Sequence, residues 1–548
     1  MTSFLLQNPV LPGFHPDPSF CRVGDDYYLA TSTFEWFPGV ALHHSRDLVH
    51  WRPIGHALTR RSHLDLRGVP DSGGSWAPSL SHADGLFWLV YTNVVTTGKG
   101  RPFKDMRVFL STAPNIEGPW SDPVRLNSLG FDPSLFHDED GRKWIINLRW
   151  DHRPGRHRFA GIVAQEYDPV ARRLVGPLHE LMRKPDKLCE GPNLYRHSGY
   201  YYLMQAEGGT GWRHGISMAR SRQLLGPYEP DPQPLILTSW EDPDHPLQKA
   251  GHGELVETPA GEWWLAHLCS RPLRTGQATT SSTDRHGGDF CVLGRETALQ
   301  RVEWTEDGWL RLAQGGTLPS LSWPAPSGLK PHPWPLEPQR TLFTGPGLDA
   351  RWQTLRVPAS EDWLSFTARP GWLRLTGRES PQSLHEQSLI ARRLTSFAAT
   401  ATARVDFSPT QFTQFGGLVC WYDTRTYFAL QITHDEVQGR MLCVTVGDDL
   451  VYSEPEDARR SIPDWPCAVC LRARINHGAL EFFASPDGNE WTPLGGIFDA
   501  HKLSDDYGSA FHFTGAMIGL SCHDVAGQGA SMDVEWFELD VPGTSAIF

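Results

Sequence analysis

The sequence predicts an all-β protein, a five-bladed β-propeller followed by a C-terminal β-sandwich. The chain of 548 residues contains 52 Gly and 44 Pro, a composition typical of many short strands and turns. A motif of a short strand, a turn and an aromatic strand recurs five times before residue 310. Beyond a proline-rich stretch, apolar and polar residues alternate with a period of two, as expected of a sandwich.

The repeat is clearest in its aromatic strands. One aromatic residue marks each unit: Tyr28, Trp88, Trp144, Tyr202 and Trp264. They are 56 to 62 residues apart, and a turn containing Gly precedes each of them, which predicts five hairpin-based units of similar size. Such units are typical of propeller blades, which stack radially around a channel. The segments 45–51, 117–120 and 225–228 share a second pattern and are expected to form outer strands.

In a propeller the innermost strands line the channel, so the residues just before them converge at one mouth. The five equivalent positions are Asp17, Trp76 with Ala77, Asp132, Glu190 and His252. Three of them are carboxylates, and carboxylates that share a pocket raise one another's pKa values, which supplies both protonated and ionised forms. A calcium-binding ring or a set of solvated turn caps is the alternative.

The first of these positions lies in a restrained segment. Asp17 stands between two prolines, which favour an extended backbone at the residue before each of them. An Asx-Pro turn that only begins a strand would use the same residues. The recurrence of the motif in other units favours a functional carboxylate.

Composition narrows the ligand class. A net charge of −13 disfavours nucleic acid and anionic membrane surfaces as partners, whereas 22 Trp and 26 Phe provide faces that stack on neutral sugars.

We see neither a signal peptide nor an apolar run long enough to span a membrane, and we expect a soluble cytoplasmic protein. Nine scattered cysteines suit reduced thiols, and Cys467 and Cys470 lack the second pair that a zinc site needs.

Two carboxyl groups on either side of a neutral substrate are the equipment of glycoside hydrolysis. Several dense segments resemble glycoside hydrolase family 43, in particular its two-domain β-xylosidases: 8–19, 33–39, 70–78, 130–141, 190–192, 206–209 and 293–297. The resemblance is dense over residues 8–310 and thinner to the C-terminus. It implies an exo-acting enzyme that needs no cofactor and releases xylose from the non-reducing ends of short β-1,4-xylo-oligosaccharides, with α-L-arabinofuranosidase activity as an additional expectation.

The resemblance also implies roles for the three carboxylates. Asp17 matches the general base of an inverting mechanism, Glu190 the general acid, and Asp132 the third carboxylate that keeps the acid protonated and oriented. Inversion requires about 6.5–9.5 Å between base and acid, to admit a water. Cys189, directly before the matched acid, departs from the polar or β-branched residue expected there.

Further residues match the substrate-binding positions of the family. Phe34 and Trp76 match aromatics of the pocket wall, Arg295 the arginine beside the terminal sugar, and His252 a histidine of the channel. Phe513, with Phe511 as a weaker candidate, matches a C-terminal loop that covers the pocket. No metal ligand is implied, although a calcium ion in the channel is kept as an alternative.

The domain boundaries follow from the proline-rich stretch. We expect a propeller over residues 1–318, a stiff linker over 319–340 and a sandwich over 341–548 that completes the pocket rim. Two alternatives to the exo-hydrolase stay open: a carbohydrate-binding propeller without turnover, and a retaining transglycosylase with Asp17 as nucleophile. A homo-oligomer is compatible with the sequence.

Overall fold

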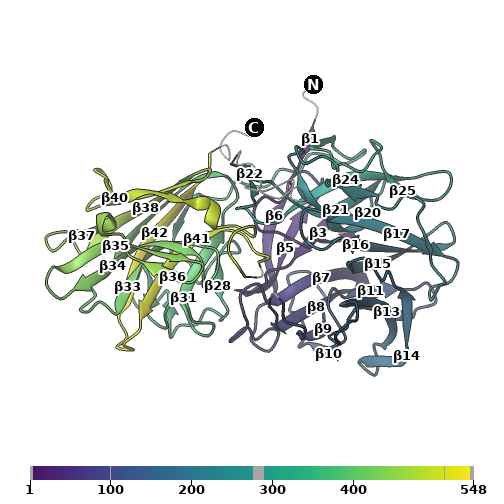
Figure 1. Cartoon of the computed structure of the whole chain (residues 1–548), viewed down its shortest axis with the longest axis horizontal. Coiled ribbons are helices and arrows are strands. Elements are labelled where there is room, and N and C mark those ends of the chain that lie inside the picture. The colour runs from purple at the N-terminus through teal and green to yellow at the C-terminus, as the bar shows by residue number, and fades with distance from the viewer. Residues whose placement is uncertain (1–3, 99, 276–288, 511, 543–548) are drawn as a thin grey trace.

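Five antiparallel sheets stack around an axis in the N-terminal part of the chain (Figure 1). The computed structural model describes residues 4–98, 100–275, 289–510 and 512–542. The first two blades contain β2 (Ser19–Val23), β3 (Asp26–Thr31), β5 (Gly39–Ser45) and β6 (Arg52–Leu58), then β7 (Gly74–Ala83), β8 (Leu86–Thr96), β9 (Asp105–Ala113) and β10 (Val124–Asn127). This confirms the predicted propeller.

The other three blades follow in chain order. Blade three contains β11 (Ser134–His137), β12 (Lys143–Trp150), β13 (Phe159–Asp168) and β14 (Arg173–Met182). Blade four contains β15 (Cys189–His197), β16 (Tyr200–Glu207), β17 (Gly215–Ser221), β18 (Glu229–Pro230) and β19 (Leu237–Thr238). Blade five contains β20 (Gln248–Glu257), β21 (Trp263–Ser270), β24 (Glu296–Trp304) and β25 (Leu310–Leu312), beside the small hairpin of β22 (Leu273–Arg274) and β23 (Asp289–Phe290).

The C-terminal part is a sandwich of two sheets, which confirms the second half of the fold prediction. One sheet contains β27 (Arg340–Leu342), β29 (Leu364–Ser365), β30 (Leu373–Thr376), β32 (Ala398–Asp406), β38 (Ala468–Asn476), β39 (Ala479–Ser485), β40 (Thr492–Asp499) and β42 (Ser531–Asp540). The other contains β28 (Gln353–Leu355), β31 (Ser388–Arg393), β33 (Gln414–Trp421), β34 (Tyr427–Asp435), β35 (Gly439–Asp448), β36 (Val451–Ser453), β37 (Arg459–Ser461) and β41 (Met517–Asp524). Two 3-10 turns are present in the described residues, η1 (Glu456–Ala458) and η2 (Ala500–Lys502).

The turns of the repeat form as their residues dictate. Gly24, Gly85, Gly141, Gly199 and Gly261 each join the first two strands of a blade, and their φ angles lie between 62° and 87°. Glycine adopts this left-handed region without the steric penalty of a side chain. The expected outer strands are wrong: segments 45–51, 117–120 and 225–228 are the turns that precede the outermost strands β6, β10 and β18.

The proline-rich stretch lies along the propeller. Its β26 (Ser322–Pro324) pairs with β1 (Leu5–Gln7) at the N-terminus. Farther along, the Trp334 indole donates a hydrogen bond to the carbonyl oxygen of His50 at 3.2 Å, and the Arg52 guanidinium stacks on its ring. The chain then enters the sandwich at β27, which pairs with β42.

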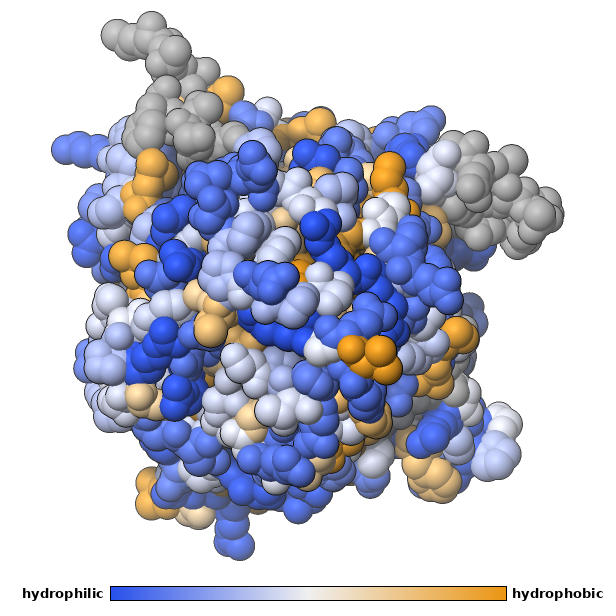
Figure 2. All heavy atoms as spheres, turned by 90° about the vertical axis from the view of Figure 1, so that its left-hand side faces the viewer, coloured by the Kyte–Doolittle hydropathy of each residue, from blue (hydrophilic) through white to orange (hydrophobic). Residues whose placement is uncertain are grey.

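A strand of the propeller completes a sheet of the sandwich. β4 (Trp36–Phe37), in the loop between β3 and β5, pairs with β28 at the edge of the second sheet. Trp36 is fully buried in this contact. The outer face of the sandwich, by contrast, is mostly hydrophilic with small separate apolar spots (Figure 2). The sandwich therefore packs through its inner end on blade one.

The described residues contain no helix long and apolar enough to cross a membrane. All nine cysteines are free thiols, and Cys467 is the exposed one. Cys470 is buried in β38, and Cys467 lies just before that strand.

Substitution of Gly13 tests the domain contact. A Cβ at this position would lie 2.6 Å from the carbonyl oxygen of Leu394 in the sandwich, and φ is +84°. We expect Gly13→Ala to lower the free energy of unfolding by about 1–3 kcal/mol more than Gly24→Ala. Gly24 has a φ of +62° with nothing within 4 Å, so this control carries the backbone strain without the clash. Equal losses in denaturant melts of the two variants would contradict a tight contact.

Candidate active site

A pocket of about 630 Å³ opens at the mouth of the propeller channel, where the sandwich meets the blades. It is lined by all eight candidate residues: Asp17, Phe34, Trp76, Asp132, Glu190, His252, Arg295 and Phe513. Phe511 lies outside the described residues. The five-fold repeat thus brings together residues from every blade, and Phe513 joins them from the second domain.

In each blade, one residue within the inner strand or just before it has a left-handed backbone. The φ angles are 53° at Asp17, 26° at Ala77, 52° at Asp132, 54° at Gly191 and 41° at His252. In β7, β15 and β20 the pairing register also shifts at this point. Bulges and left-handed residues re-aim the side chains beside them, here into the pocket. The expectation of an extended backbone at Asp17 is therefore wrong, because the kink common to all blades overrides the local effect of Pro18.

Asp17 is held as a carboxylate by three groups. Arg295 Nη1 donates to its Oδ1 at 2.7 Å, Ser32 Oγ donates to its Oδ2 at 2.7 Å, and His252 Nδ1 lies 3.9 Å from Oδ1. Burial opposes the charge, but Arg295, His252 and Ser32 outweigh it and hold the pKa of Asp17 below its usual value. The group is ionised near neutral pH.

The other two carboxyl groups behave in the opposite way. Burial, then the charges of Glu190 and Asp17, raise the pKa of Asp132 well above its usual value, although it accepts a hydrogen bond from the Gly191 N–H at 3.1 Å. Burial, with a contribution from Asp17, raises the pKa of Glu190 to about 7, against the attraction of Lys104 and Arg295. The pocket thus holds one ionised carboxylate and two groups that retain protons toward neutral pH.

Aromatic side chains form one wall. Phe34, Trp76 and Phe513 contact one another with ring centroids 5.3–5.9 Å apart, and Phe131 meets the edge of Trp76 at 5.4 Å. Trp76 is fixed from behind, because its Nε1 donates to the carbonyl oxygen of Ser72 at 3.0 Å. Such a surface matches the apolar face of a sugar ring.

Arg295 connects this aromatic wall to Asp17. Its Nη2 donates to the Phe513 carbonyl oxygen at 3.1 Å while Nη1 holds Asp17, and the side chain is only 2% exposed. Because guanidinium is planar and always charged, both contacts constrain one rigid group. The arginine therefore fixes the position of the loop that carries Phe513 relative to the Asp17 carboxylate.

Several lining residues were not predicted from the sequence. Lys104 lies 4.8 Å from the ring centres of Trp76 and Trp150, and burial lowers its pKa to about 8 although Glu190 and Asp132 oppose the shift. Trp150, Arg158 and Phe159 line the outer part of the pocket. They come from loops and strand ends outside the repeated frame, and an aromatic or basic residue near the carboxylates is a weak signal without the fold.

The unexpected thiol beside Glu190 is inert. Cys189 is buried, and burial raises the pKa of its thiol to about 12. It pairs with Glu207 in β15 and β16 rather than lining the pocket. Across the parts of the chain that the structure describes, no group of three or more His, Cys, Asp or Glu side chains could hold a metal ion.

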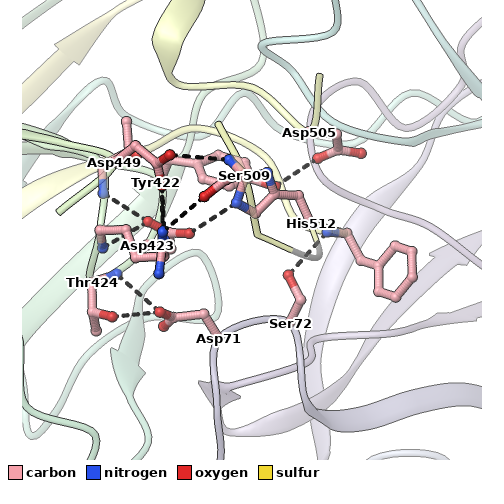
Figure 3. Close-up of polar contacts among 12 residues, drawn as sticks. Asp71, Ser72, Tyr422, Asp423, Thr424, Asp449, Asp505, Ser509 and His512 are labelled. Atoms are coloured by element: carbon pink, nitrogen blue, oxygen red, sulfur yellow. Dashed lines mark hydrogen bonds and ion pairs between the residues drawn. The ribbon is translucent and has the colours of Figure 1, made fainter. Parts of the chain in front are cut away.

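A polar network connects the loop that carries Phe513 to both domains (Figure 3). The Phe513 N–H donates to Ser72 Oγ in the propeller at 2.9 Å. On the sandwich side, Tyr422 donates to Asp505 at 2.9 Å, and His512 Nε2 lies 3.4 Å from Asp423 Oδ2. The loop that carries Phe513 is therefore anchored at both ends.

The same network includes a direct bridge between the domains. Asp71 of the propeller accepts hydrogen bonds from Thr424, through its hydroxyl and its backbone N–H. The other oxygen of Asp71 accepts from Arg356 Nη2 at 2.7 Å, and Arg356 Nε donates to the Val69 carbonyl oxygen at 2.8 Å. These contacts hold the 69–72 loop, and with it Ser72, in place.

Comparisons with known proteins agree with this architecture. The family described as glycosyl hydrolases family 43 matches residues 6–310, and the beta xylosidase C-terminal concanavalin A-like domain matches residues 340–540. A beta-xylosidase of Bacillus subtilis is 45% identical over 97% of this chain and 99% of its own length. Xylosidase/arabinosidase 43B of Humicola insolens is 45% identical over 97% of each chain. The crystal structure of a xylan beta-1,4-xylosidase from Bacillus halodurans C-125 superposes with a TM-score of 0.93 at 48% identity, covering 98% of this chain and 100% of that one.

The ion pair between His512 and Asp423 can be tested through the pKa of His512. Burial alone would lower the pKa of His512, but Asp423 and then Asp505 outweigh it and raise that pKa above 6.5. The pair therefore stabilises the fold fully below about pH 6.5, and this contribution is lost as the pH rises through the raised value. We expect Asp423→Asn to lower the pKa of His512 in NMR titrations of the imidazole signals.

The exposed Asp457 of η1 gives the matched control for this titration. Asp457→Asn should leave the pKa of His512 unchanged. An unchanged value in Asp423→Asn as well would rule out the ion pair as the cause.

Proposed function

Because the chain belongs to glycosyl hydrolases family 43, we propose that this glycoside hydrolase is an exo-acting, inverting β-xylosidase that releases xylose from the non-reducing ends of short β-1,4-xylo-oligosaccharides. The observation that carries the proposal is the set of three buried carboxyl groups with opposite pKa shifts in one pocket. The names of the Bacillus relatives support xylose as the released sugar.

Asp17 is the proposed general base. Ser32 and Arg295 each occupy one lone-pair direction of its two oxygens, and a carboxylate offers about four, so directions remain for a water molecule. The lowered pKa keeps the group ionised and ready to accept a proton from that water. As the water loses its proton, its oxygen attacks the anomeric carbon from the face opposite the leaving group.

Glu190 is the proposed general acid. Its pKa of about 7 keeps the proton available near neutral pH, and protonation of the glycosidic oxygen allows the leaving sugar to depart as a neutral alcohol. Asp132 is proposed to hold Glu190 in its protonated form, because a second charge so close would be unfavourable. The division between acid and base thus follows from environment rather than from residue type.

The pocket walls support exo action. Phe34, Trp76 and Phe513 close one end around the space beside Asp17, which suits a single terminal sugar ring. Arg295 is within reach of hydroxyl groups on that ring. Lys104, Trp150 and Arg158 line the pocket as well, and we propose that the remaining sugars of an oligomer lie beside them.

We also propose α-L-arabinofuranosidase activity in the same pocket. The xylosidase/arabinosidase of Humicola insolens matches almost the whole chain, and the two sugars present similar hydroxyl groups to one wall. Both activities would then use Asp17 and Glu190. A cytoplasmic location, a homo-oligomer and a calcium ion in the channel stay predictions from the sequence.

The stereochemistry of the first product tests inversion. During hydrolysis of 4-nitrophenyl β-xyloside by the full chain, where xylose comes only from the cleaved centre, we expect proton NMR to show α-xylose before mutarotation. β-Xylose as the first product would overturn the inverting mechanism and favour a retaining enzyme with Asp17 as nucleophile. Asp17→Ala should show no product of either configuration on the same time scale, which gives the control.

The leaving group distinguishes the acid from the base. We expect Glu190→Ala to lower kcat/KM for xylobiose by about 10²–10⁴-fold, but far less for 4-nitrophenyl β-xyloside, because nitrophenolate departs without a proton. Asp17→Ala should lower both by a similar factor. In the wild type, kcat/KM should fall as the pH rises through about 7, where Glu190 loses its proton, and this limb should vanish in Glu190→Ala. Equal losses on the two substrates would remove the acid role.

A further inference from the structure

A second cavity, of about 230 Å³, lies between blade one and the sandwich. The propeller side supplies the N-terminal segment around His15 and the strands β5 and β6, and the sandwich side supplies the end of β31 with Arg392 and Arg393. His15 belongs to the segment that carries Asp17, yet no role in the pocket absorbs it.

Four nitrogen atoms of this cavity lack hydrogen-bond partners within the described ranges. They are His15 Nδ1, His43 Nδ1, Arg392 Nη1 and Arg393 Nη2. His15, His43 and Arg393 are only 8%, 5% and 8% exposed. A buried donor without a partner destabilises the folded state, and more strongly when it is charged. Donors from two domains that face one cavity therefore indicate a ligand that accepts hydrogen bonds.

Three arginines, Arg351, Arg392 and Arg393, line the cavity together with the carboxylate of Glu337, so its net charge is positive. Arg393 Nε donates to the Phe14 carbonyl oxygen at 2.6 Å, but among the described residues no carboxylate pairs with Arg393 or Arg392. Burial lowers the pKa of Arg393 to about 9, and burial with the neighbouring Arg351 lowers that of Arg392 to about 10, so both stay charged at neutral pH.

The two acidic side chains near the cavity form ion pairs with Arg351. Asp349 and Glu337 are 39% and 55% exposed at the rim, and both pair with Arg351, at 2.6 Å and 3.9 Å. The imidazoles add no charge, because burial and then Arg393 lower the pKa values of His15, His43 and the adjacent His56. A neutral imidazole with its proton on Nδ1 still donates a hydrogen bond.

We propose that this cavity binds a small oxyanion of the size of inorganic phosphate or sulfate. Arg392 and Arg393 supply the charge, and His15 supplies a neutral donor from the opposite domain. Water occupies about 30 Å³ per molecule, so the cavity accommodates a tetrahedral anion together with ordered water. The inference does not depend on which glycoside the active site hydrolyses.

The anion would act as a bond between the domains beside the catalytic segment. The Phe14 ring lies between Arg393 and the pocket aromatic Phe34, at 5.5 Å from the guanidinium and 5.8 Å from the ring. The His15 carbonyl oxygen accepts a hydrogen bond from Thr297 Oγ1 at 2.6 Å, two residues before Asp17. Occupation should therefore stabilise the folded two-domain chain.

Thermal unfolding of the full chain tests the site. With sodium phosphate at pH 7 and the ionic strength held constant with sodium chloride, the melting temperature should rise in a saturable manner. At about ten times the dissociation constant, mass action predicts a rise of roughly 1–2 °C for a chain of this length. Arg392→Gln should lose most of this rise, whereas Arg404→Gln, which removes an exposed arginine paired with Glu535, should keep it. An equal rise in wild type and Arg392→Gln would overturn the proposal.

A second measurement holds if Arg392→Gln fails to fold. Crystals of the wild-type chain soaked in sodium selenate should show an anomalous selenium peak in the cavity, with a selenate oxygen within hydrogen-bond distance of Arg393 Nη2. Density for ordered water alone at that position would overturn the proposal.

Discussion

The buried ion pair between Arg295 and Asp17 joins the three parts on which the active site depends. Asp17 precedes the first strand of blade one, Arg295 precedes β24 of blade five, and the same guanidinium holds the carbonyl of Phe513 in the sandwich. A buried pair adds little stability by itself, but removal of one partner leaves an unpaired charge at large cost. One contact thus joins the first blade to the last, keeps Asp17 ionised and positions the loop that carries Phe513.

The sequence was sufficient for the blades because their signals are local. A turn glycine, an aromatic strand and a fixed frame before the inner strand recur at a steady spacing, and the eight candidate residues follow from that frame or from the family resemblance. The signals that failed depend on tertiary context. The left-handed backbone at Asp17 recurs near the corresponding position of every blade and is therefore a property of the propeller. The turns that were expected to be outer strands differ from strands only in lacking a pairing partner.

Residues from unrepeated loops escaped prediction for a related reason. Lys104, Trp150 and Phe159 reach the pocket only because blades two and three place their loops beside the carboxylates. The cavity around Arg393 needs both domains, since His15 and Arg393 are 378 residues apart in sequence and meet through the contact of Phe14 with β31. No spacing rule within one segment reveals such pairs. Neither the segment around His15 nor the segment around Arg393 contains a pattern that points to the other.

The pairing of β4 with β28 constrains how this architecture can be recombined. Two residues of the propeller form an edge strand of the neighbouring sheet, and Phe34 of the aromatic pocket wall lies just before them. A sandwich transplanted from a relative would have to accept that strand in register, or the wall would shift with it. The unit that can be exchanged between such enzymes is therefore the whole two-domain chain, and engineering of the rim has to treat the donor loop and its acceptor sheet as one part.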